Sequence, residues 1–155
     1  MPGQEIIDDL DIGIIKLLSK DGRMSFAEIA NQLGVTEKTV RARFNNLKEN
    51  NIIEVVGVVN PISLGIKIGA IIQLRVDPQD LKRVIEETSV LKEVRYITLT
   101  SGDYLLLLQV HVRTYDDLAE FIKEKLGRIE GISKTNMIVQ LEVYKNTFEY
   151  LKEDN

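Results

Sequence analysis

From Ile66 onward, the sequence repeats one order of elements twice: a strand, a helix and a strand. Apolar residues alternate along the strand segments, as in strands that bury one face. Asp77 and Pro78 predict the start of the first helix, and Thr114 predicts the N-cap of the second. The expected strands span residues 70–76, 94–100, 106–112 and 137–143. This βαββαβ order predicts a ferredoxin-like α+β domain over residues 67–146.

The two faces of such a sheet are expected to differ, because the helices of this fold lie on one face. The opposite face mixes apolar and polar side chains: Ile71, Gln73, Arg75, Leu105, Leu107, Gln109, His111, Arg113, Ile138, Gln140, Glu142 and Tyr144. A partly apolar face with a polar rim is typical of a subunit interface. We therefore expect a homodimer that packs sheet to sheet. An exposed face with scattered apolar residues is the alternative.

The first third of the chain has a helical period. Three short helices are expected, over about residues 8–20, 25–33 and 36–50. Ser25 and Glu28 have the spacing of a capping box, and Gly34 is suited to end the second helix. Two helices joined by a short turn that contains glycine form a helix-turn-helix. Residues 1–52 are therefore assigned to a helix-turn-helix DNA-binding domain.

A short β-rich segment follows this domain. Residues 52–59 are mostly Ile and Val, and they predict a β-wing or connecting strand. Asn60-Pro61 and Ser63-Leu64-Gly65 are typical of turns. We assign residues 53–66 to a β-wing and linker, and residues 147–155 to a polar C-terminal tail.

Charge is unevenly distributed along the chain. The formal net charge is -4, which is unusual for a nucleic-acid binder because phosphate contacts need Lys and Arg. Residues 36–50, however, hold four basic and two acidic side chains, a local net charge of +2. Residues 53–155 hold thirteen basic and sixteen acidic side chains. We therefore expect DNA to contact the N-terminal domain.

Several classes of site are not indicated by the sequence. Without cysteine there is no disulfide, thiol nucleophile or thiolate metal site. His111 is the one histidine and lies on an expected strand, where a lone histidine is usually structural. The sequence shows no Ser-His-Asp set and no His/carboxylate metal spacing. No apolar run approaches the roughly 20 residues of a membrane span, and the N-terminus lacks a basic signal-peptide region. We expect a cytoplasmic protein with no catalytic site, no metal site and no membrane partner.

The third expected helix has a buried arc and a polar arc. Val40, Phe44 and Leu47 share one narrow arc. Arg, Lys and Asn can read base edges, Thr can bond phosphates, and the small Ala42 permits close approach. The residues predicted to contact double-stranded promoter DNA are Thr36, Lys38, Thr39, Arg41, Ala42, Arg43, Asn45 and Asn46. Arg43 lies nearer the buried arc, so it either reaches a phosphate from the side or pairs internally. The alternative for the whole face is a solvated helix surface.

Motifs in both halves occur in a specific order. The first half contains LDxxII (10–15), DGRMS (21–25) and EIAxxLGVT (28–36). The second half contains GDYLL (102–106) and GIxxT (131–135). Together they resemble the Lrp/AsnC, or feast/famine, family over about residues 8–144. One departure is Asn51, where the family often has Gly; Asn tolerates the left-handed conformation, so the turn is expected to survive.

The resemblance implies a winged helix-turn-helix joined by a β-linker to the βαββαβ domain, in a prokaryotic protein, archaea included. It also implies dimers that assemble into octamers, with an amino-acid effector bound between dimers and no other cofactor. The effector residues it implies are Thr98, Thr100, Gly102, Asp103, Tyr104 and Thr135. Gly102 would let backbone N–H groups approach a carboxylate, and Asp103 would pair with an ammonium. From the residues alone, residues 101–103 are an ordinary hairpin turn.

The function predicted is a sequence-specific transcriptional regulator that responds to an amino acid or a related metabolite. One alternative is an architectural protein that compacts DNA without an effector. The other is an enzyme similar to siroheme decarboxylases, which resemble this family in both halves. Their large acidic tetrapyrrole would require basic and histidine side chains around the pocket, whereas the C-terminal half is net acidic.

Overall fold

The computed structural model describes residues 7–146 and residue 151. The described residues divide into two compact units, one of residues 7–58 with 145, 146 and 151, and one of residues 59–144. None of the helices in the described part of the chain is long and apolar enough to cross a membrane.

The N-terminal unit is built from three helices, as predicted: α1 (Asp9–Lys20), α2 (Phe26–Leu33) and α3 (Glu37–Glu49). A side-chain N-cap begins each one, namely Asp8, Ser25 and Thr36. The buried core of this unit consists of Ile14, Leu18, Ile29, Ala30, Val40 and Leu47. The apolar faces of the three helices therefore meet in a single core.

Two left-handed residues fix the turns around α3. Gly34 ends α2 with φ +67°, and the space where its side chain would lie is open. Asn51 follows α3 with φ +56°. The prediction that Asn51 adopts this conformation is confirmed.

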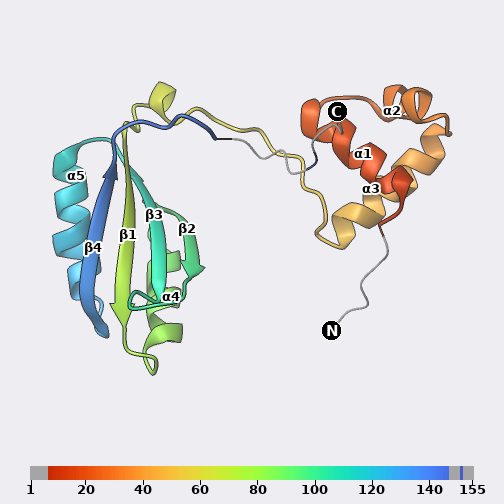
Figure 1. Ribbon diagram of the computed structural model, residues 1–155. Helices are drawn as coiled ribbons and strands as arrows, with labels where there is room; N and C mark the ends of the chain where they lie inside the picture. Colours follow the sequence, from red (N-terminus) through yellow and green to blue (C-terminus); the bar gives the residue numbers. More distant parts are fainter. Residues whose placement is uncertain (1–6, 147–150, 152–155) are drawn as a thin grey trace. The chain divides into compact units, whose positions relative to one another are not determined.

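The C-terminal unit contains a four-stranded antiparallel sheet in the order β2-β3-β1-β4 (Figure 1). Its strands are β1 (Ile68–Val76), β2 (Val94–Leu99), β3 (Leu106–Val112) and β4 (Ile132–Gln140). Ile72 on β1 lies opposite Leu108 on β3 and Met137 on β4, so these three share one face. The predicted ferredoxin-like βαββαβ domain is confirmed.

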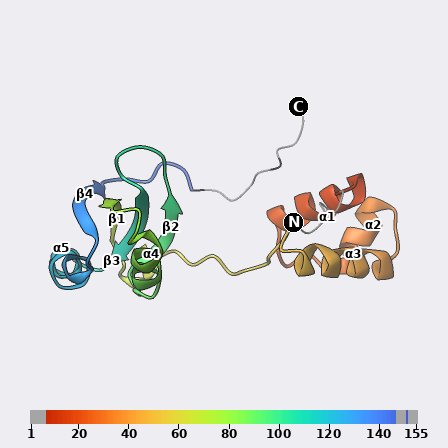
Figure 2. The same ribbon diagram turned by 90° about the horizontal axis from the view of Figure 1, so that it is seen from below.

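Helices α4 (Leu81–Ser89) and α5 (Tyr115–Glu120) pack on the same face of this sheet (Figure 2). Helix α5 continues as a π-helical turn, Phe121–Lys125, and a 3₁₀ turn, Leu126–Arg128. The buried core between sheet and helices consists of Ala70, Ile72, Leu74, Val76, Val84, Leu106, Leu108, Val110, Val112, Leu118, Phe121 and Leu126. The opposite face of the sheet is left without a covering layer within the described part of this unit.

The predicted β-wing over residues 52–59 is wrong. Residues 53–60 form neither helix nor strand. Three of its valines are 61–70% exposed: Val56, Val58 and Val59. Ile52 instead donates its backbone N–H to the carbonyl of Leu47 and packs against the helical core. Val and Ile favour strands, but a strand also needs a partner edge, and no described residue provides one here.

Two predicted boundaries in the C-terminal unit are also wrong. Helix α4 begins at Leu81 rather than directly after Asp77, because the N–H of Asp80 donates to the carbonyl of Asp77 and closes a turn first. Strand β4 spans residues 132–140 rather than 137–143, because its pairing with β1 ends where Gln140 lies opposite Gly69. The predicted strand residues 141–143 are consequently exposed and outside the sheet.

Candidate DNA-binding helix and effector site

Helix α3 presents the polar face that the helical projection predicts. Val40 and Leu47 are 0% and 3% exposed, and Phe44 packs against Phe26 with ring centroids 5.1 Å apart. Six of the predicted DNA-binding residues are exposed: Thr36, Lys38, Arg41, Ala42, Asn45 and Asn46. The other two, Thr39 and Arg43, are half-buried. The exposed face can therefore enter a groove without disturbing the core.

The start of α3 carries two neighbouring hydroxyls. Thr36 Oγ1 accepts the backbone N–H of Thr39 at 3.1 Å, and the two hydroxyl oxygens are 2.8 Å apart. One hydroxyl proton bridges the pair, so the other can be donated to a phosphate oxygen.

Arg41 is held by two neighbours. Its Nη2 lies 2.7 Å from Glu37 Oε1, one turn earlier, and its Cζ lies 5.1 Å from the centroid of the Phe26 ring. The Arg41 side chain is nevertheless 58% exposed. Such an exposed pair adds little stability, but the two contacts restrict the positions of the guanidinium. The i,i+4 spacing of Glu37 and Arg41 could have been read from the sequence, whereas the contact with Phe26 could not.

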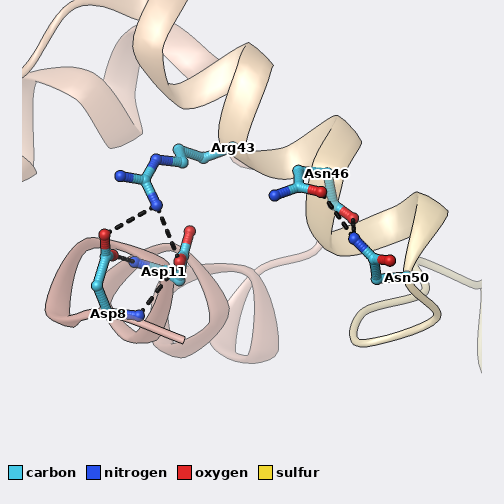
Figure 3. Close-up of polar contacts among 5 residues, drawn as sticks. All are labelled: Asp8, Asp11, Arg43, Asn46 and Asn50. Atoms are coloured by element: carbon cyan, nitrogen blue, oxygen red, sulfur yellow. Dashed lines mark hydrogen bonds and ion pairs between the residues drawn. The ribbon is translucent and has the colours of Figure 1, made fainter. Parts of the chain in front are cut away.

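Arg43 makes an internal ion pair with α1 (Figure 3). Its Nη1 lies 2.8 Å from Asp8 Oδ2 and 3.1 Å from Asp11 Oδ2, and the Asp11 side chain is only 8% exposed. The backbone N–H of Asp11 donates to the Asp8 carboxylate and lowers its pKa, and the charge of Arg43 lowers it further. Burial acts in the opposite direction but does not outweigh these two contributions. Of the two roles predicted for Arg43, the structure therefore shows the internal ion pair. A contact of Arg43 with DNA stays a prediction.

The end of α3 contains a side-chain amide pair. Asn50 Nδ2 donates to Asn46 Oδ1 at 2.7 Å and to the Asn46 carbonyl at 3.0 Å (Figure 3). Bidentate pairing with adenine requires both the amide oxygen and the amide nitrogen of an asparagine. Asn46 must therefore share its oxygen with Asn50 to read adenine in this way.

The predicted effector residues centre on the turn between β2 and β3. The Thr100 N–H donates to the Leu105 carbonyl at 2.8 Å, and the Thr100 hydroxyl donates to the Tyr104 carbonyl. Gly102 has φ +98°, and a Cβ there would meet nothing within 4 Å. Gly102 therefore has a backbone conformation that favours glycine, and the space beside it is open in the single chain.

Two cations that the sequence did not single out for this site lie beside the turn. Arg75 Nη2 lies 3.0 Å from Asp103 Oδ2, and Arg75 Nε donates to the Asp103 carbonyl at 3.2 Å. Lys134 Nζ lies 6.0 Å from the centroid of the Tyr104 ring. Arg75 and Lys134 are opposite each other on β1 and β4. A register prediction for these strands would have paired them, but their place beside the turn depends on the tertiary fold.

Thr98 and Thr135 are not brought together within one chain. Thr98 lies opposite Leu107 and shares its open face, whereas Thr135 lies opposite Leu74 and shares the face that carries the helices. Strands β2 and β4 are also the two edges of the sheet. Of the predicted effector residues, one chain therefore gathers Thr100, Gly102, Asp103 and Tyr104.

Comparisons with known proteins agree in both halves of the chain. Residues 7–48 match the AsnC-type helix-turn-helix domain, and residues 69–150 match the Lrp/AsnC ligand binding domain. The HTH-type transcriptional regulator LrpA of Pyrococcus horikoshii is 37% identical over 141 residues, which cover 90% of this chain and 100% of that protein.

Solved structures show the same architecture. Escherichia coli AsnC superposes with a TM-score of 0.86 at 28% identity, over 92% of this chain and 97% of that one. A Neisseria meningitidis transcriptional regulator, solved in complex with L-Met, superposes with a TM-score of 0.85 at 18% identity, over 92% of this chain and 95% of that one. The second likeness concerns the fold alone.

The two family matches occur in the order that the motifs predicted, and together they cover most of the chain. The relatives are described as transcriptional regulators and not as enzymes. A regulator with a helix-turn-helix domain binds DNA. The chain belongs to the Lrp/AsnC family of transcriptional regulators.

Proposed function

We propose that this protein is a sequence-specific regulator that reads the major groove of promoter DNA with α3. The exposed polar face of α3 carries this proposal, because Lys38, Arg41 and Asn45 project from the side opposite the buried Val40 and Leu47. Lys38 forms no ion pair with a described residue, and Arg41 is positioned by Glu37 and Phe26. Donors of this kind, on one helix face, suit guanine and adenine edges.

The reading unit in this proposal is a homodimer formed sheet to sheet. Ile71 lies opposite both Gln109 and Ile138 on the uncovered face, and Gln73 lies opposite Leu107. Ile138 is 47% exposed in the single chain. This mixture of apolar centre and polar neighbours suits an interface between two copies, and a two-fold pair of α3 helices suits two DNA half-sites. Assembly of dimers into an octamer and a cytoplasmic location stay predictions.

An amino acid is the proposed effector, bound near the β2–β3 turn and between copies of the chain. The family domain over residues 69–150 is a ligand binding domain, and a regulator of the same fold was solved with L-Met. Asp103 offers a carboxylate that is 81% exposed at its side chain, although Arg75 already pairs with it. The separation of Thr98 from Thr135 is compatible with a site shared between copies.

DNA affinity, measured by fluorescence anisotropy on a promoter fragment, tests the reading helix. Arg41→Ala should weaken specific binding about tenfold or more, since one base-edge contact contributes about 1–3 kcal/mol. Lys16→Ala removes one charge from α1 and is the matched control; it should leave affinity within about twofold, since Lys16 lies on α1 and not on the predicted reading face of α3. Equal effects of the two variants would mean that α3 does not read DNA with this face.

The effector proposal has its own test. Asp103→Ala should abolish any change that an amino acid causes in DNA binding, while the binding of DNA alone is preserved. A normal amino-acid response in this variant would place the ligand elsewhere. Binding without a preference for any sequence would favour the architectural alternative.

A further inference from the structure

The C-terminal unit contains a cavity of about 430 Å³ at the other end of β3 from the β2–β3 turn. It lies between the end of β3, the segment before β2, and α5 with its π-helical turn. Its lining residues are Ile66, Lys92, Glu93, His111, Val112, Arg113, Asp117, Glu120, Phe121 and Lys125. Small-molecule sites usually measure about 300–1,000 Å³, so the cavity has the volume of such a site.

Two buried polar atoms at this cavity have no partner among the described residues: Glu93 Oε2 and His111 Nδ1. Glu93 Oε1 is bonded by Lys125 Nζ at 2.7 Å, and the Glu93 side chain is only 13% exposed. Burial opposes the charge of Glu93, but the hydrogen bond from Lys125, the backbone N–H of Glu93 and the charges of Lys125 and Lys92 together outweigh burial and lower its pKa. Glu93 therefore presents an ionised oxygen that lacks a donor, which is costly in a buried position.

Lining charges of both signs restrict the kind of ligand. Three basic residues, Lys92, Arg113 and Lys125, face three acidic ones, Glu93, Asp117 and Glu120. Asp117 is already used, since its carboxylate accepts the N–H of Thr114 in the cap of α5. Lys92 and Arg113 form no ion pair with a described residue.

These observations exclude several ligand classes. A simple anion would meet as many negative as positive groups, and a purely apolar molecule would leave Glu93 Oε2 without a donor. A metal ion is not favoured either, because no group of three or more His, Cys, Asp or Glu side chains in the described part of the chain could hold one. A molecule that carries both charges can meet Glu93 with its cationic group and Lys92 and Arg113 with its anionic group at the same time.

We propose that this cavity is a second ligand site, separate from the β2–β3 turn, that binds a free amino acid through both its ammonium and its carboxylate. Glu93 Oε2 accepts from the ammonium, and Lys92 and Arg113 donate to the carboxylate. Val112 and Phe121 supply apolar wall for the side chain of the ligand. The inference goes beyond the proposed function, which places its effector at the turn.

The cavity is also connected to the uncovered face of the sheet. The backbone N–H of His111 donates to the carbonyl of Glu93 at 2.9 Å. His111 lies opposite Gly69 on β1, next to the residues proposed for the dimer interface. Because His111 and Val112 of β3 line the cavity, a ligand there lies against a strand that also takes part in the proposed interface.

Calorimetric titration of the full-length protein with each proteinogenic amino acid at millimolar concentration tests this site. At least one amino acid should bind wild type, and its deaminated acid and decarboxylated amine should each bind roughly tenfold more weakly or not at all. Glu93→Gln keeps the shape of the side chain and should weaken binding roughly 10- to 100-fold. Arg113→Gln should also weaken binding. Because Arg113 is exposed, this substitution is less able to affect folding.

Lys123→Gln is the control, because Lys123 is exposed on the same helical segment and does not line the cavity. It should bind like wild type. Asp103→Ala can lose the site at the turn, but it should retain the binding that Glu93→Gln and Arg113→Gln weaken. Binding that is lost in Asp103→Ala but unchanged in Glu93→Gln and Arg113→Gln would overturn the cavity site and retain the site at the turn. No binding of any amino acid to wild type would mean that the cavity holds water only. DNA binding without ligand should be normal in all four variants, so failure of this inference is distinct from failure of the proposed DNA-binding function.

Discussion

Replacing Arg43 with methionine tests whether this side chain holds the N-terminal unit together. Methionine keeps an unbranched apolar stem and removes the guanidinium. The carboxylate of Asp11, 8% exposed, would lose a cation at 3.1 Å and remain buried. Loss of a hydrogen bond to a charged group costs about 1.5–3 kcal/mol. Because the Arg43 side chain is 38% exposed, solvent screening lowers the expected loss of unfolding free energy to about 1–2 kcal/mol.

Urea unfolding followed by far-ultraviolet circular dichroism measures this loss, and DNA affinity is measured in parallel. Lys38→Met is the matched control, since Lys38 lies on the same helix and forms no ion pair with a described residue. It should preserve stability and weaken DNA binding. A double-mutant cycle of Arg43→Met with Asp11→Asn should show that the two substitutions are not additive. Unchanged stability of Arg43→Met together with lost DNA affinity would refute the structural role.

Three further predictions follow from local features. Gly34→Ala should lower the unfolding free energy by about 1 kcal/mol, because φ is +67° there and the space is open, whereas Gly57→Ala, also in open space but without a positive φ, should have little effect in the same urea experiment. Ile138→Asp should dissociate the proposed dimer in light scattering, while Val90→Asp, at an exposed site on the helix side, should not; a dimeric Ile138→Asp protein would contradict the sheet-to-sheet interface. Asp8 has a lower pKa in the folded state than the ordinary Asp value of 3.8. Its ionised carboxylate therefore stabilises the folded state fully above pH 3.8, and this stabilisation is lost as pH falls through the lower folded-state pKa. Acid unfolding of Asp8→Asn should lack this component, and identical acid-unfolding curves for the two proteins would contradict it.

Sequence patterns predicted the elements whose causes are local. The capping box of Ser25 and Glu28, the left-handed Gly34 and the cap at Thr114 each depend on residues within three or four positions. The buried arc of α3 follows from helical period alone. These features were correct because the residues that determine them are neighbours in sequence.

Long-range pairing accounts for the errors. The valines of residues 55–59 favour a strand, but no described residue offers them an edge. The end of β4 is set by its partner β1 and not by its own alternation, which continues through Leu141 and Val143. The sequence could not show where a partner strand stops.

The candidate sites divide in the same way. The exposed face of α3 could be predicted, but the contacts of Arg41 with Phe26 and of Arg43 with Asp8 depend on how three helices pack. At the β2–β3 turn, the resemblance supplied Gly102 and Asp103, whereas the Arg75 partner was identified only from the fold. The cavity beside Glu93 had no sequence signal, because its charged residues come from three separate segments.

A footprint on the protein's own promoter, at near-physiological salt and with each amino acid added in turn, tests the central claim most directly. The account predicts a protected region with helical phasing, as expected for two α3 helices on two half-sites, and a change in that protection with at least one amino acid. Uniform coating of the DNA at high protein concentration, or no protection, would contradict the assignment of a sequence-specific regulator.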